Sequence, residues 1–339
     1  MLFRQLFDKT SSTFTYLIAS SEGREALIID PVLEDVNKYI LLLKGLNLKL
    51  VKVIDTHIHA DHISGIAELR DRTNCVTIMG DKTTADIVSM QVSDGELIEI
   101  DGLELRALFT PGHTSESFSF VMNDRVFTGD TLLIGGTGRT DFQNGDPLDS
   151  YNSIFNKLLK LKDNILVYPA HDYRGNTVST ILKEKKFNPR LQVKSSTEYV
   201  DIMNNLNLPN PKLMDVAIPK NLKMGVDLNI QKMNNGIEAH SFKICLEESN
   251  ILLIDIREQC EINKIGKIKN SITVSFPEIN EYLQVNKIKL KDKKIFFYCA
   301  IGQRSALTIK TSKTLGYKNC QHLIGGIKEW INVGFNLAR

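Results

Sequence analysis

The sequence lacks the features that mark membrane, secreted or nucleic-acid-binding proteins. No stretch of its 339 residues approaches the roughly 20 consecutive apolar residues of a membrane span. The first residues, Met1 to Asp8, contain no apolar signal core. The formal net charge of +2 is too near neutral to indicate a nucleic-acid partner. We therefore expect neither a membrane nor a nucleic acid among its partners.

Cysteine is also scarce, and the pattern of the five cysteines is uninformative about pairing. They are widely scattered and odd in number: Cys75, Cys245, Cys260, Cys299 and Cys320. Such a set argues against a disulfide framework and for a reducing compartment, so we expect a cytoplasmic protein. The length suggests two domains, and the 42% hydrophobic and 24% charged residues are ordinary for a globular protein.

What the sequence does contain is a dense group of potential metal ligands. His57, His59, Asp61 and His62 occupy four of six consecutive positions. An apolar segment that predicts a strand, residues 50–54, precedes this group, and a predicted helix begins after Gly65. The ligands therefore belong to a loop at the carboxyl end of a strand, and imidazole and carboxylate groups suit first-row divalent metals. A solvated polar loop is the alternative, and the density of histidine argues against it.

Three further predicted strands end in the same kind of residue. His113 follows residues 103–109, Asp130 follows residues 126–128, and His171 follows residues 165–167. Each alone is compatible with a hydrogen-bonded core histidine or a turn aspartate, but the repeated placement argues for one shared site. Together with the first cluster, these motifs resemble the ligand set of the metallo-β-lactamase fold. That resemblance implies an αββα sandwich with a metal at one edge of its two sheets.

A glycine-rich segment, residues 132–143, follows Asp130 directly, so we expect it beside the metal. It contains Arg139 and Asp141, while Tyr173 and Arg174 follow His171. These side chains are candidates for binding a charged substrate. A flexible connector is the alternative interpretation of this loop.

Residues 138–143, 171–175 and 205–212 resemble the corresponding motifs of the persulfide dioxygenases, the ethylmalonic encephalopathy protein family. The resemblance covers residues 1 to about 225. It implies one Fe(II) per chain, held by His57, His113 and Asp130, that supports oxidation of glutathione persulfide by O2 and water to sulfite and glutathione. The other residues are assigned by the same resemblance. Those that orient the ligands and water would be His59, Asp61, His62 and His171, and those that contact glutathione would be Arg139, Asp141, Tyr173 and Arg174.

The remaining pattern of the first domain predicts helices over residues 35–44, 149–160, 177–186 and 197–206. The proline-containing segment from 208 to 221 reads as an extended tail. Polar residues 231–236 end in an Asn-Asn-Gly turn signal, which predicts the domain boundary there. The expected domains are therefore 1–230 and 235–339.

The second domain alternates strands with helices, which predicts a small parallel α/β domain. Cys299 ends the predicted strand 295–298 and precedes a helix, where backbone N–H groups and the helix dipole favour a thiolate. Arg304 adds positive charge nearby. A buried structural cysteine is the alternative interpretation.

Residues 235–339 resemble a rhodanese through the strand end Asp255-Ile256-Arg257, the loop from Cys299 to Ser305 and the late Gly325-Gly326 pair. The resemblance implies that an exposed Cys299 accepts sulfur from thiosulfate and passes it to glutathione, within a loop shaped by Gly302, Arg304 and Ser305. Two residues depart from the family pattern: Ala300 stands where a cation is common, and Lys267 where a histidine is common.

Two other functions are compatible with these motifs. The first domain could bind two zinc ions and hydrolyse a thioester, as hydroxyacylglutathione hydrolases do, with an accessory rhodanese-like domain. Alternatively, Cys299 could only store persulfide in a sulfur-carrier or redox-sensing protein. A homodimer is compatible with the sequence but not specified by it.

Overall fold

The computed structural model describes residues 1–338 and divides the chain into two compact units. The first unit comprises residues 1–70 and 77–224, and the second comprises residues 71–76 and the chain from Gly225 onward. The division after Met224 lies earlier than the boundary expected from the sequence. The helix α7 (Leu228–Met233) spans residue 230, where the first domain was expected to end, and it belongs to the second unit.

Two six-stranded sheets form the centre of the first unit, in the orders β1-β2-β3-β4-β5-β6 and β14-β13-β10-β9-β8-β7. The strands of the first sheet are β1 (Leu2–Asp8), β2 (Thr13–Ala19), β3 (Glu25–Ile29), β4 (Lys49–Ile54), β5 (Val76–Gly80) and β6 (Met90–Val92). Those of the second are β7 (Leu97–Ile100), β8 (Leu103–Phe109), β9 (Phe118–Val121), β10 (Arg125–Gly129), β13 (Leu166–Pro169) and β14 (Ser179–Thr180). A short separate ribbon pairs β11 (Leu132–Leu133) with β12 (Gly136–Thr137).

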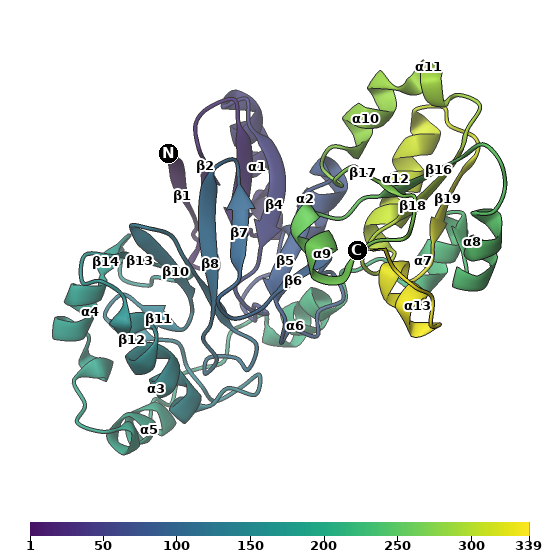
Figure 1. Ribbon diagram of the computed structural model, residues 1–339. Coiled ribbons are helices and arrows are strands. Elements are labelled where there is room, and N and C mark those ends of the chain that lie inside the picture. The colour runs from purple at the N-terminus through teal and green to yellow at the C-terminus, as the bar shows by residue number, and fades with distance from the viewer. Residues whose placement is uncertain (339) are drawn as a thin grey trace. The chain divides into compact units, whose positions relative to one another are not determined.

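Helices cover the outer faces of both sheets, which gives four layers (Figure 1). On the first sheet, Tyr39 of α1 lies 3.0 Å from the hydroxyl of Thr15 on β2. On the second sheet, apolar residues of β9, β10 and β13 share a core with α3, α4 and α5. The helices are α1 (Val36–Gly45), α2 (Ile66–Thr73), α3 (Pro147–Asn156), α4 (Ile181–Phe187), α5 (Ser196–Asn204) and α6 (Met214–Leu222), with single 3₁₀ turns at Leu33–Asp35, Leu158–Lys160 and Pro189–Leu191. The expected αββα sandwich is confirmed.

Aromatic rings from the two sheets meet in the space between them. Tyr16 of β2 lies with its ring centroid 4.9 Å from that of Phe127 on β10, and Phe3 of β1 lies 5.0 Å from Tyr168 on β13. Offset and tilted aromatic pairs at such distances are worth about 0.5–1.5 kcal/mol beyond the area they bury. These pairs fix the sheets relative to each other just below the strand ends that carry the ligand-type residues.

Two sequence expectations for this unit are wrong. The helix expected over residues 177–186 begins only at Ile181, because residues 179–180 form β14 and Thr180 caps the helix by accepting from the Lys183 amide. The expected extended tail contains α6, a helix with Pro219 inside it. Proline usually disfavours a helix interior, but the Asn221 side chain in this helix is held by three hydrogen bonds to the backbone of residues 59–64. Tertiary contacts thus override the local preference.

The second unit is built on a five-stranded sheet in the order β15-β19-β18-β16-β17, and every pair is parallel. Its strands are β15 (Gly236–Ile237), β16 (Ile251–Asp255), β17 (Ile272–Thr273), β18 (Lys294–Tyr298) and β19 (Cys320–Leu323). Its remaining helices are α8 (Ala239–Cys245), α9 (Gln259–Ile265), α10 (Ile279–Val285), α11 (Lys287–Leu290), α12 (Gln303–Thr314) and α13 (Gly326–Asn332). The expected parallel α/β domain is confirmed.

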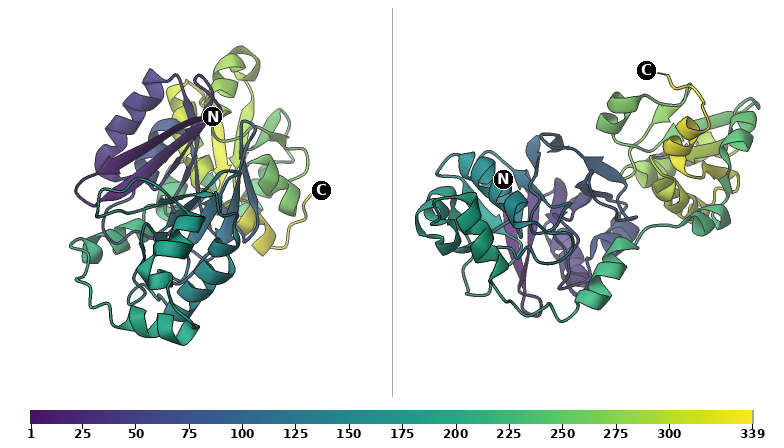
Figure 2. Two further views of the ribbon diagram at one scale, coloured as in Figure 1. Left: turned by 90° about the vertical axis from the view of Figure 1, so that its left-hand side faces the viewer. Right: turned by 90° about the horizontal axis from the view of Figure 1, so that it is seen from below.

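Both faces of this sheet are covered by helices (Figure 2). Successive residues of β18 point to opposite faces, as in any strand. Phe297 therefore packs with α10 and α12, whereas Phe296 packs with Phe242 of α8 and Trp330 of α13. Cys299, two residues after Phe297, falls on the α12 face and is buried among apolar side chains.

Candidate metal centre

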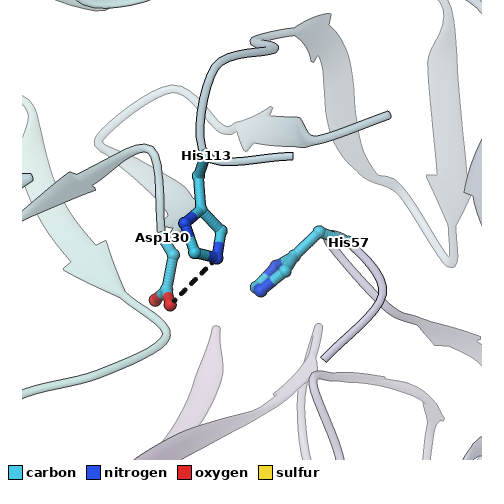
Figure 3. A group of neighbouring side chains, drawn as sticks. All are labelled: His57, His113 and Asp130. Carbon is cyan, nitrogen blue, oxygen red and sulfur yellow. Dashed lines mark ion pairs between the residues drawn. The ribbon is translucent and has the colours of Figure 1, made fainter. Parts of the chain in front are cut away.

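Three loops that follow three different strands bring His57, His113 and Asp130 together (Figure 3). One ligand-type atom from each of these residues lies within 4.8 Å of the other two. His113 Nε2 is 3.6 Å from Asp130 Oδ2, His57 and His113 are buried, and the Asp130 side chain is 12% exposed. Two imidazoles and one carboxylate on one side of a cavity form the arrangement that binds a divalent transition metal while leaving further coordination positions open.

Hydrogen bonds fix the two imidazoles in the form that a metal requires. His113 Nδ1 lies 2.7 Å from the Arg139 carbonyl oxygen, which can only accept, so Nδ1 carries the proton and Nε2 keeps its lone pair. His57 Nδ1 lies 2.9 Å from the Thr56 hydroxyl, whose own proton goes to Asp30. Burial and the neighbouring His59 hold the pKa of His57 well below its ordinary value, so this ring is neutral. The donor set therefore fits a metal ion.

Asp130 is oriented by His171. Its Oδ1 lies 2.6 Å from His171 Nδ1, which leaves Oδ2 directed at the two other ligands. Burial alone would raise the pKa of Asp130, but the charge of His171 outweighs it and holds that pKa well below its usual range. The opposite nitrogen, His171 Nε2, lies 2.9 Å from Asp61 Oδ2. Both nitrogens of His171 thus contact carboxylates.

The remaining residues of the first histidine cluster form a second group of potential ligands: His59, Asp61 and His62. Asp61 Oδ2 lies 2.9 Å from His62 Nδ1, and His59 Nε2 lies 3.2 Å from Asp30 Oδ1. Burial opposes the charged form of His59, but the Asp30 carboxylate outweighs it and raises the pKa of His59 to about 9. Among the described residues, His59 Nδ1 and His62 Nε2 are buried and have no hydrogen-bond partner.

The glycine-rich loop packs directly on these residues, as its position after Asp130 predicted. A Cβ atom on Gly138 would lie 2.1 Å from the Asp130 carbonyl oxygen and 2.9 Å from His113 Nδ1, so a larger residue would displace the ligands. The loop forms one wall of a pocket of about 310 Å³ that opens beside His113 and Asp130. Phe142, Tyr173 and Leu208 contribute apolar surface to this pocket.

The charged residues expected to bind substrate differ in their availability. Arg139 lines the pocket, but its guanidinium donates to both Asp141 oxygens and to the carbonyl oxygens of Leu208 and Pro209. It therefore holds the 208–209 segment against the loop. Arg174 is exposed and also lines the pocket, and no hydrogen bond from its guanidinium is found within residues 1–338. Tyr173 stacks on His171 with 5.9 Å between ring centroids.

In the second unit, Cys299 lies at the end of β18, and its sulfur accepts a hydrogen bond from the Gly302 amide at 3.1 Å. Gly302 caps α12 with a φ of 86°, a conformation that favours glycine. Arg304 is buried and paired with both oxygens of Glu261, at 2.8 and 2.6 Å, so its charge is shared with that carboxylate. Contrary to the expected exposed sulfur, Cys299 is fully buried, because it continues the inward-facing residues of β18.

Comparisons with known proteins place both units. Residues 9–86 and 83–171 match the metallo-beta-lactamase superfamily, and residues 238–333 match the rhodanese-like domain. The chain is 44% identical over 229 residues to the mitochondrial persulfide dioxygenase ETHE1 of Homo sapiens, which covers 67% of this chain and 89% of that protein. The crystal structure of ETHE1 from Myxococcus xanthus is 49% identical, with a TM-score of 0.64, and covers 65% of this chain and 98% of that one.

The chain belongs to the persulfide dioxygenase family. In this chain the dioxygenase domain is fused to a C-terminal rhodanese-like domain. A metallo-beta-lactamase structure from Staphylococcus aureus, 24% identical with a TM-score of 0.61, extends over 96% of this chain and 98% of that one, which shows the fold alone. Among residues 1–338, no helix is both long and apolar enough to cross a membrane. The cytoplasmic location stays a prediction.

Three residues of this persulfide dioxygenase were missed by the sequence analysis. Asp30 ends β3 as the other site residues end their strands, so its position before Pro31 was a usable signal. Asn221 donates to the carbonyl oxygens of His59 and His62 at 2.8 and 2.9 Å from about 160 residues away, and Arg190 lines the pocket while donating to Thr137. No local sequence pattern marks the last two.

The first prediction concerns the hydrogen bond that fixes His57. We expect Thr56→Val to weaken metal binding by about 10- to 100-fold, because mutation of a residue that hydrogen-bonds to a metal-ligating histidine lowers metal affinity by this amount. Competition with a chelator of known affinity measures the change. Thr77→Val is the matched control, since Thr77 is a buried threonine whose hydroxyl bonds to Ile87 and Ser89 instead. Equal metal affinity in Thr56→Val and wild type would contradict the prediction.

Proposed function

We propose that the first unit is an iron-dependent dioxygenase that oxidises glutathione persulfide with O2 and water to sulfite and glutathione. The observation that carries this proposal is the set of His57, His113 and Asp130, whose remaining polar atoms are all occupied by neighbouring groups. One Fe(II) per chain held there would supply the redox chemistry that O2 requires, which zinc cannot. The membership of the family supports the same reaction.

The protein's own residues would position the persulfide at this site. Glutathione carries two carboxylates, and Arg174 and Arg190 line the pocket beside the ligands. The exposed guanidinium of Arg174 is the available anion-binding group, whereas Arg139 serves by holding residues 208–209 in place. Phe142 and Tyr173 would contact the apolar part of the substrate and limit the access of water to the reacting sulfur. Asp141 would act on glutathione only indirectly, because its two carboxylate oxygens accept hydrogen bonds from Arg139.

The alternative zinc-dependent thioester hydrolase keeps one observation in its favour. The buried nitrogens His59 Nδ1 and His62 Nε2 have no hydrogen-bond partner within residues 1–338, so they could bind metal. We propose that the two nitrogens bind ordered water, because buried polar atoms require a partner. Metal stoichiometry separates the two functions.

We further propose that the second unit is a thiosulfate sulfurtransferase. The Cys299 thiolate would attack the outer sulfur of thiosulfate, forming a cysteine persulfide and releasing sulfite. The thiolate of glutathione would then attack that sulfur and leave as glutathione persulfide, which restores the Cys299 thiolate. Because the Cys299 side chain is buried, this transfer requires a movement of the 299–302 loop. The product is the substrate proposed for the iron centre, whereas a carrier protein would only store the sulfur.

The second prediction tests the metal centre. Anaerobically purified protein should contain one iron per chain and should consume O2 with glutathione persulfide. Asp130→Ala should lose both the iron and the O2 consumption while circular dichroism shows an unchanged fold, because the carboxylate completes the ligand set. Asp201→Ala, at an exposed aspartate of α5, should change neither. Two equivalents of zinc in active protein would instead support the hydrolase.

The third prediction concerns substrate binding. Arg174→Ala should raise the KM for glutathione persulfide about tenfold with little change in kcat, since a hydrogen bond to a charged group is worth about 1.5–3 kcal/mol and exposure weakens it. Steady-state O2 uptake measures both constants. Arg106→Ala is the control, because Arg106 is exposed on β8 and does not line the pocket. An unchanged KM in Arg174→Ala would remove this residue from the substrate site.

The fourth prediction separates the two units. Cys299→Ser should abolish O2 consumption that depends on thiosulfate and glutathione, because no persulfide is supplied. The same variant should consume O2 at nearly the wild-type rate when given glutathione persulfide. His57→Ala should show the reverse, with sulfur transfer intact and O2 uptake lost, and Cys245→Ser should behave as wild type. Thiosulfate-dependent uptake that persists in Cys299→Ser would show that the second unit does not supply the substrate.

A further inference from the structure

The buried position of Cys299 poses a chemical problem for sulfur transfer. A thiol must lose its proton to become a nucleophile, but the Cys299 side chain is completely buried. The Gly302 amide at 3.1 Å and the first turn of α12 can stabilise a thiolate, yet neither can accept the proton. An acceptor within the protein would remove the proton while the loop is still closed.

The side chain of Ser305, in the first turn of α12, reaches this sulfur. Its hydroxyl oxygen lies 3.6 Å from Cys299 Sγ, within the range of a hydrogen bond to sulfur, and 3.1 Å from His322 Nδ1. His322 comes from β19, the strand next to β18. The three side chains are all fully buried. They form a continuous line from the thiol to an imidazole.

The other side of His322 sets its tautomer. Its Nε2 lies 3.0 Å from the backbone carbonyl oxygen of Gln231, which can only accept, so Nε2 carries the proton and Nδ1 keeps a lone pair on the side of Ser305. The Ser305 hydroxyl also donates to the Gly302 carbonyl oxygen at 3.1 Å. Burial lowers the pKa of His322, so the resting imidazole is neutral, and the other influences on it are hydrogen bonds to the backbone at Gln231 and Leu323. The ring is thus a base held in the correct orientation.

Gln231 also binds the loop itself. Its side-chain oxygen accepts from the Gly325 amide at 3.0 Å, and its side-chain nitrogen donates to the Ile301 carbonyl at 3.3 Å. A Cβ atom on Gly302 would lie 2.0 Å from the Gln231 side-chain oxygen, so the two are in close contact. Gln231 of α7, in the expected boundary stretch 231–236, therefore fixes both the loop and the histidine.

We propose that Ser305 and His322 form a proton relay that generates the Cys299 thiolate inside the protein. The thiol proton passes to the Ser305 oxygen as the Ser305 proton turns from the Gly302 carbonyl oxygen to His322 Nδ1, which leaves a thiolate and an imidazolium with no net change in charge or oxidation state. A nucleophile, a base and a group that orients the base are the parts of an activated nucleophile. His322 is a positioning residue here, because it never touches the sulfur. The inference rests on the sulfur transfer proposed for Cys299.

Other charges near the sulfur do not differ between the variants that test this relay. Arg304 acts electrostatically on Cys299, and Glu261 and Glu258 act in turn on Arg304. All three remain in each variant, so their effect cancels in the comparison. His240, on α8 of the same unit, contacts Phe335 with 5.1 Å between ring centroids and is exposed, which makes it a matched control.

The fifth prediction concerns the pH dependence of Cys299 reactivity in the full-length protein. The rate at which iodoacetamide alkylates Cys299 is measured against pH for each variant and corrected with the same variant carrying Cys299→Ser. His322→Gln, which can still donate to the Gln231 carbonyl, should move the midpoint of this rate profile up by at least one pH unit, which is about a tenfold lower rate at a fixed lower pH. Ser305→Ala should give the same shift, and the double variant no more than either single one. At high pH all should reach the wild-type rate, because hydroxide then removes the proton directly.

Three outcomes would overturn the relay: an unchanged midpoint in His322→Gln, shifts that add in the double variant, or an equal shift in His240→Gln. Ser305→Thr, which keeps the hydroxyl, should restore the wild-type midpoint. The proposed function is judged separately by the thiosulfate sulfurtransferase activity of wild type and Cys299→Ser. If the variants shift the midpoint as expected but wild type has no sulfurtransferase activity, the sulfurtransferase is rejected and the relay is kept. If wild type is active but His322→Gln does not shift the midpoint, only the relay is rejected.

Discussion

The dioxygenase site depends on one buried carboxylate, that of Asp30. Its oxygens accept hydrogen bonds from the amide and hydroxyl of Thr56, at 2.7 and 3.0 Å, and one of them also lies 3.2 Å from His59 Nε2. A buried charge is tolerated only when its lone pairs are satisfied, so this carboxylate forces the chain after β4 into one conformation. Because the Thr56 hydroxyl donates to Asp30, its oxygen accepts the proton of His57 Nδ1. The lone pair of His57 Nε2 is then available to a metal.

The two units solve their chemical problems with the same structural device. In each, the reactive residues follow the carboxyl ends of strands, and a glycine allows close approach, Gly138 beside the metal ligands and Gly302 beside Cys299. In each, a carbonyl oxygen that can only accept sets a histidine tautomer, through Arg139 for His113 and Gln231 for His322. Backbone geometry thus decides which nitrogen is available, and side-chain identity decides what that nitrogen does.

Much of this was predictable because the signals are local. Apolar strands followed at once by ligand-type residues indicated where His57, His113, Asp130 and His171 would meet, and alternating strands and helices indicated the second domain. The errors arose where distant contacts override local preference. The helix around Pro219 is held through Asn221. The expectation that the Cys299 sulfur is exposed was also wrong. The position of a residue at the end of a strand does not reveal which side chains pack over it.

By itself, the sequence determined which ligand-type residues end strands and that strands alternate with helices in the second domain, because strand periodicity and ligand spacing are properties of short segments. Its motifs carried the resemblance that implied the family and the fold of the first domain. Only the tertiary structure decided which ligand atoms are free, that Arg139 is engaged while Arg174 is not, and that Ser305 and His322 meet behind Cys299. The physical reason is that a hydrogen bond depends on distances of a few tenths of an ångström between residues far apart in the chain. No local pattern encodes such distances.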